Sequence, residues 1–142
     1  MAIFLCLLTL LQVTPTEPAP PSPEAAIEET LMNYYEGMFD GDAERVRRSL
    51  HPEMIQRGIA KWSKTNDYFF PGVLVSNLVE DTRAGVTKRP KDTRMIDVNI
   101  LDVSRRSAVA RVETTTCIDY VNLAKIDDEW KIMLIFFESK GP

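Results

Sequence analysis

One histidine and one aspartate are the side chains in this sequence most suited to chemistry. His51 is the only histidine, and its ordinary titration lies near neutral pH, so it is a candidate general acid or base. It stands directly before Pro52, at the expected end of a helix, where it would equally well interact with the last carbonyl groups of that helix. The sequence leaves both interpretations open.

Asp119 is the second candidate, because it lies in a strand-like stretch whose neighbours are mostly uncharged. If it faces the interior, burial raises its pKa and suits it to proton abstraction. Simple alternation along one long strand instead places Asp119 on the same face as Arg111 and Glu113. That parity favours solvent and a structural or surface role.

Two more residues complete the candidate site. Tyr34 is a pocket candidate, with simple core packing as the alternative, and Arg57 would pair either with an anionic ligand or with a surface carboxylate. A lone histidine without spaced His or Cys partners makes no metal site, and no catalytic triad order, phosphate loop or paired-cysteine motif is present. We therefore expect a pocket lined by Tyr34, His51, Arg57 and Asp119, with no metal and no cofactor.

The elements that must position these residues belong to a single domain. The chain has 142 residues, of which 44% are hydrophobic and 27% charged, as in one ordinary domain. The densest groups among its 17 basic side chains are short and flanked by acids, and the formal net charge is −4. Nucleic-acid binding needs clustered Lys and Arg, so we do not expect it.

The first 23 residues differ in composition from the rest. Residues 1–13 form a nearly continuous apolar leader, long enough for a secretory signal and too short for a membrane span. Residues 14–23 hold five of the nine prolines and read as an extended spacer before a domain at 24–142. We expect export, to a periplasm or out of the cell, with the leader cleaved or retained at the membrane. The alternative is that the leader is an element of the domain.

Helices are expected first along the domain. Ser22 and Pro23 predict the start of a helix with apolar residues at helical spacing, and Gly41 predicts its end. Asp42 caps a second, short helix that ends before Pro52. Residues 53–68 are ambiguous, with a further short helix as one interpretation, and residues 71–85 suggest a helical turn or two, with a strand as the alternative.

The last third has the period-two pattern of β-strands. Three strands are predicted, at 93–103 with a bulge near Leu101, at 107–126, and at 129–139 after a turn at Asp127 and Asp128. In the last of these, residues 134–137 are apolar on both faces, which predicts that a second copy of the chain covers one of them. The sequence thus predicts an α+β fold and a homodimer.

Several runs resemble the branch called "putative lumazine-binding" in the nuclear transport factor 2-like superfamily. The resemblance covers roughly residues 25–138. It rests on the segments at 33–37, 41–46, 50–53 with Arg57, 103–112, 119–123 and 130–132.

The resemblance implies a cone-shaped fold in which a curved antiparallel sheet wraps around N-terminal helices, commonly dimeric through the sheet. Relatives include isomerases, cyclases, dehydratases and noncatalytic binding modules, so the fold does not choose among functions. The leading hypothesis is a noncatalytic or weakly catalytic small-molecule-binding module. The alternatives are an isomerase- or cyclase-type enzyme with Asp119 or His51 as base, and an interaction or scaffold domain whose cone is filled.

Overall fold

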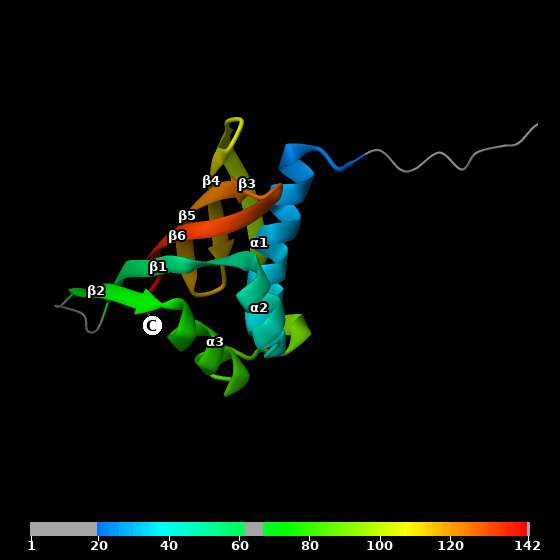
Figure 1. Cartoon of the computed structure of the whole chain (residues 1–142). Helices are drawn as coiled ribbons and strands as arrows, with labels where there is room; N and C mark the ends of the chain where they lie inside the picture. The colour runs from blue at the N-terminus through cyan, green and yellow to red at the C-terminus, as the bar shows by residue number, and fades with distance from the viewer. Residues whose placement is uncertain (1–19, 62–66, 142) are drawn as a thin grey trace, which may run out of the picture.

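The protein is described by a computed structural model that places residues 20–61 and 67–141 (Figure 1). The expected leader and most of the proline-rich spacer lie outside these described residues. The elements follow the order α1, α2, β1, β2, α3, a short 3-10 helix η1 at Lys91–Thr93, and β3 to β6.

The first helix, α1 (Pro23–Asp40), begins and ends where the sequence predicts. The Ser22 side chain accepts a hydrogen bond from the backbone N–H of Ala25, and Pro23 occupies the first turn, where its missing N–H costs nothing. Gly41 ends the helix at φ 78°, a left-handed conformation that glycine adopts without strain. The predicted start after the spacer is confirmed.

Two shorter helices follow. Asp42 caps α2 (Ala43–Ser49) by accepting from the backbone N–H of Arg45. The helical interpretation within residues 71–85 is confirmed by α3 (Val75–Arg83), which contacts α2 as well as strands β1 and β2.

A six-stranded sheet forms the other layer, in the order β2-β1-β6-β5-β4-β3. Its strands are β1 (Leu50–Lys61), β2 (Asp67–Leu74), β3 (Ile96–Val103), β4 (Ser107–Thr114), β5 (Cys117–Ile126) and β6 (Glu129–Ser139). All neighbours are antiparallel except β1 and β6, which run parallel. Figure 1 shows the sheet curving past α1, which contacts β3 and β6. The expected α+β cone-type fold is confirmed, with one parallel pair in place of a wholly antiparallel sheet.

Two features of the sheet correct the expectations from the sequence. The short helix suggested within residues 53–68 is wrong, because this stretch supplies β1, hydrogen-bonded to strands on both sides. Sheet pairing overrides its ambiguous local pattern. The single strand expected at 107–126 is also wrong: it is divided into β4 and β5 by a turn at Thr115 and Thr116. The predicted bulge at Leu101 is confirmed, as is the turn at Asp127 and Asp128, which have φ of 48° and 65°.

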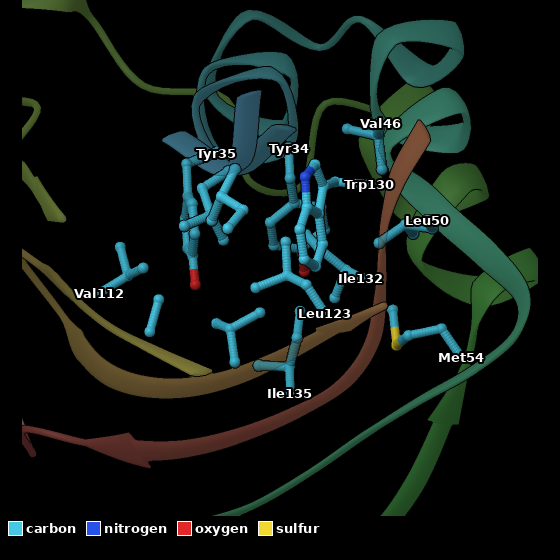
Figure 2. Packing of buried hydrophobic residues seen from close by; sticks show 14 of the residues in the cluster. Tyr34, Tyr35, Val46, Leu50, Met54, Val112, Leu123, Trp130, Ile132 and Ile135 are labelled. Carbon is cyan, nitrogen blue, oxygen red and sulfur yellow. The ribbon is translucent and has the colours of Figure 1, made fainter. Parts of the chain in front are cut away.

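The core lies between α1 and the inner face of the sheet. Figure 2 shows Tyr34 and Tyr35 reaching from the helix toward the strands, with Trp130 and Ile132 beside Tyr34. Both tyrosines are fully or almost fully buried, as are Ile132 and Ile135 of β6. The core thus includes two hydroxyl groups, each of which lowers the stability of the fold if it has no hydrogen-bond partner.

Candidate functional site

A cavity of about 290 Å³ opens at the end of the core beside Tyr35. Its walls come from α1, β1, β2, α3, the segment that follows α3, and the ends of β4, β5 and β6. Most of the wall is apolar, contributed by Met38, Phe39, Phe70, Val73, Leu78 and Phe137. The volume and the apolar walls suit a small organic molecule.

Asp119 is the buried charged group of this cavity. The turn at Thr115 and Thr116 resets the side-chain alternation, so that Asp119 is paired with Val112 of β4 and shares its inward face. Only 5% of Asp119 is exposed. The parity argument that placed it toward solvent with Arg111 and Glu113 is therefore wrong, because it assumed an unbroken strand.

The environment of Asp119 is poor in compensating groups. Its Oδ2 atom accepts a hydrogen bond of 2.6 Å from the Tyr35 hydroxyl. Among the described residues, its Oδ1 atom has no hydrogen-bond partner, and the carboxylate forms no ion pair. Burial raises the pKa of Asp119 to about 6, although the hydrogen bond from Tyr35 acts in the opposite direction. A carboxyl with this pKa exchanges protons readily near neutral pH.

Tyr34 and Tyr35 differ in how their hydroxyls are used. The two rings contact edge to face with centroids 4.9 Å apart. Burial and the nearby Asp119 raise the pKa of both tyrosines, so both stay protonated. Tyr35 lines the cavity and binds Asp119, whereas the Tyr34 hydroxyl is buried without a hydrogen-bond partner among the described residues. Tyr34 lies in the core beside the site and is not part of the cavity wall.

The rim of the cavity is held to the end of α1. The backbone N–H of Arg89 donates to the Phe39 carbonyl, and the hydroxyl of Thr87 donates to the Met38 carbonyl. The Arg94 guanidinium donates to the carbonyls of both Phe39 and Arg89. The Arg94 guanidinium also places a positive charge at the C-terminus of α1, whose own last turn has no basic residue. These hydrogen bonds connect the segment after α3 to the C-terminal end of α1.

Two expected site residues lie elsewhere. His51 is at the start of β1, where its Nδ1 atom accepts from the backbone N–H of Glu53 at 3.2 Å, and it does not line the cavity. Arg57 is exposed and is the register partner of Phe136 across β1 and β6. Phe136 in turn pairs with Tyr120 on β5, so these three residues form one row across the sheet. Since Asp119 pairs with Phe137, one position along from that row, Arg57 and Asp119 face opposite sides of the sheet. Of the four predicted residues, the structure therefore brings only Asp119 to the cavity.

Sequence reasoning missed Tyr35, Arg89 and Cys117, which line the cavity with Asp119. Tyr35 gave a signal, because it is adjacent to Tyr34 on the same predicted helix, but the spacing did not show which ring meets the carboxylate. Arg89 and Cys117 lie next to breaks between elements and carry no periodic pattern that would have marked them.

The described part of the chain contains no cluster of three or more His, Cys, Asp or Glu side chains arranged to hold a metal ion. None of the helices between residues 20 and 141 that the structure places is long and apolar enough to cross a membrane.

The curved sheet, the long helix across it and the cavity at one end define the nuclear transport factor 2-like class of α+β folds. Similar solved structures include a protein of this class and of unknown function from Methylobacillus flagellatus, with 21% identity, a TM-score of 0.66, and coverage of 85% of this chain and 94% of that chain. A second, from Silicibacter pomeroyi, has 12% identity and a TM-score of 0.65, covering 82% and 95%. A ketosteroid isomerase-like protein from Erwinia carotovora has 14% identity and a TM-score of 0.54, covering 85% and 99%.

The family model described as "Putative lumazine-binding" matches residues 22–138, and the chain belongs to this family. The match confirms the resemblance seen in the sequence. No curated protein matches the chain in sequence.

Proposed function

We propose that this protein is a small-molecule-binding module whose ligand occupies the cavity beside Tyr35 and contacts the Asp119 carboxyl. The observation that carries the proposal is a buried carboxyl in the wall of an apolar cavity, to which no described residue brings a cationic partner. Burying such a group is costly to the fold, and a ligand that hydrogen-bonds to it offsets that cost. The unfilled volume favours this function over a scaffold domain with a plugged cone.

Native mass spectrometry of the protein purified from its own host tests the proposal. We expect a retained molecule that is lost from a variant in which Val73→Trp fills the cavity. Val73 lines the cavity and is half-buried on β2, so a tryptophan side chain at this position has room to extend into the cavity. If the Val73→Trp variant still retains the ligand, the binding site lies elsewhere.

A weak enzymatic function is the second candidate. A pKa of about 6 suits Asp119 to act as a general base near neutral pH, and one structural neighbour is described as ketosteroid isomerase-like. In that reaction class, a carboxylate takes a proton from the carbon beside a ketone, and the bonding electrons move to the carbonyl oxygen. Exchange of the α-hydrogens of cyclohexanone for deuterium, followed by NMR with wild type and Asp119→Asn, tests it. Equal exchange by the two proteins would exclude Asp119 as the base.

Assembly and location are further parts of the proposal. A second copy would cover the outer sheet face, where Tyr120 and Phe136 pair across β5 and β6 and stay 43% and 36% exposed. Export would follow from the apolar leader. The intact mass of the protein from its host reports whether residues 1–13 are removed, and a mass that includes them would favour a retained leader or an intracellular protein.

A further inference from the structure

The charges around the cavity occupy two depths. Asp119 lies at the buried end, while Asp81 of α3 is exposed at the rim and Arg89 is half-exposed. Burial raises the pKa of the Cys117 thiol on the same cavity wall, and the positive charge of Arg89 acts against that rise. Among the described residues, Arg89 forms no ion pair with Asp119. Arg89 is thus a half-exposed charge that does not pair directly with the buried carboxylate.

At the buried end of the cavity, the Asp119 carboxylate can accept more hydrogen bonds than the described residues donate to it. A carboxylate accepts several hydrogen bonds, and Tyr35 supplies only one to Asp119. Within residues 20–61 and 67–141, no Lys, Arg or His pairs with it. A charge-assisted bond from a positively charged donor is about twice as strong as a neutral one, and it gains further in a water-poor site.

The walls near the buried end suit the rest of such a ligand. Phe39, Phe70 and Phe137 line the cavity together with Tyr35. Phe137 is the register partner of Asp119, and the rings of Phe137 and Phe70 have centroids 5.4 Å apart. Aromatic faces attract organic cations and pack against flat rings. At the rim, Asp81 adds a second negative charge, and water screens both Asp81 and Arg89 more than it screens Asp119.

We propose that the cavity selects a small, largely apolar amine, whose protonated nitrogen donates to the Asp119 carboxylate while its apolar body lies among the aromatic side chains. This inference rests on the proposed function and adds the chemical class of the ligand. The buried carboxylate sets the class, because it is shielded from water while the two rim charges are more exposed.

Three probes of equal ring size test the charge requirement: benzylamine, benzyl alcohol and benzoate. Binding to the full chain is measured by calorimetry at pH 7.5, where Asp119 is ionised. We expect benzylamine to bind about ten- to hundredfold more tightly than the other two, the range for a hydrogen bond to a buried charged group. Asp119→Asn should abolish this preference. Asp81→Asn, the matched control at the rim, should change benzylamine binding by less than about threefold.

A second measurement locates the probe without a substitution at Asp119. Cys117 lines the same cavity and is half-buried, so bound benzylamine should slow its alkylation by iodoacetamide, read from the mass of the peptide that contains it. Alkylation at an unchanged rate under saturating benzylamine would place the amine elsewhere and overturn the inference.

The other possible results of the probe experiment also test the amine class. Preferred binding of benzoate, reduced by Arg89→Ala, would overturn the amine class in favour of an anionic ligand and leave the proposed binding function intact. If none of the three probes binds, the amine class is wrong. The binding function itself fails only if native mass spectrometry also finds no retained molecule.

Discussion

Tyr35 on α1 donates a 2.6 Å hydrogen bond to Asp119 on β5, and this bond joins the helix to the sheet at the buried end of the cavity. The adjacent Tyr34 is equally buried, but its hydroxyl has no hydrogen-bond partner in the part of the chain that the structure describes. One helix thus carries two neighbouring tyrosines, one with a hydrogen-bonded hydroxyl and one without, which provides a matched pair for experiment.

Removing each hydroxyl separately should give different results. Tyr35→Phe deprives a buried carboxyl of its hydrogen bond, and we expect it to lower the free energy of unfolding by about 1–3 kcal/mol. Tyr34→Phe removes a buried hydroxyl that has no partner among the described residues, and we expect a change within about 0.5 kcal/mol or a gain. Urea denaturation measures both. Equal losses in the two variants would contradict the assigned roles.

Gly58 on β1 maintains the cavity wall formed by Phe137. A Cβ atom at this position would collide with the ring and the carbonyl oxygen of Phe137, its register partner on β6. We expect Gly58→Ala to cost about 3 kcal/mol, since neither the parallel strands nor the ring can give way freely. Thermal unfolding measures this loss.

Gly72→Ala is the control for that prediction. Its Cβ atom would meet only the flexible end of the Ile55 side chain, at 2.8 Å. We expect a loss of less than about 1 kcal/mol, because that end can rotate away. Comparable losses at Gly58 and Gly72 would show that close approach to Phe137 is not the cause.

The outer sheet face gives a prediction about assembly. Sedimentation at micromolar concentration should show about twice the mass of one chain, and Phe136→Asp should yield a monomer, because it places a charge in the proposed interface. Val86→Asp is the control, since Val86 is 70% exposed in the turn after α3, away from the sheet face. A wild-type monomer that remains soluble would exclude the homodimer.

The helical half of the fold was more predictable than the sheet. Local signals define α1, because the Ser22 side-chain cap, Pro23 in the first turn and the left-handed Gly41 mark its ends. Strand β1 had no comparable signal, since its pairing with β6 depends on residues about 80 positions away. Long-range pairing of this kind leaves little trace in a local pattern.

Of the four residues predicted for the site, only Asp119 lines the cavity. Asp119 stood out because it is a charge among uncharged neighbours, but its orientation depended on a two-residue turn at Thr115 that reset the alternation. His51 and Arg57 stood out by residue type and lie away from the cavity. Residue type alone could not show on which side of the sheet a side chain faces.

The pKa of Asp119 links the site to stability. A carboxyl whose pKa is higher in the folded chain contributes stability that is complete below its ordinary value of 3.8 and is lost as pH rises through about 6. We expect wild type to gain roughly 2 kcal/mol relative to Asp119→Asn between pH 7.5 and pH 4. Denaturation of both proteins across this range measures the difference. A constant difference would contradict the raised pKa.

Other titrating groups do not obscure this comparison. Tyr34, Tyr35 and Cys117 have raised pKa values and stay protonated in this pH range. The hydrogen bond from Arg94 lowers the pKa of Asp40, so this pair loses stability as pH falls, opposite to the effect of Asp119. The pair is present in both proteins and therefore cancels in the comparison.

The proposed function depends on Asp119 being a buried carboxyl that has no cationic partner among the described residues. The most direct measurement is an NMR titration of the Asp119 side-chain carboxyl carbon in the ligand-free protein. The structure predicts a midpoint near pH 6, because burial disfavours the charged form more than the Tyr35 hydrogen bond favours it. A midpoint near the ordinary value of about 4 would show a solvated or already paired carboxylate and would contradict the account.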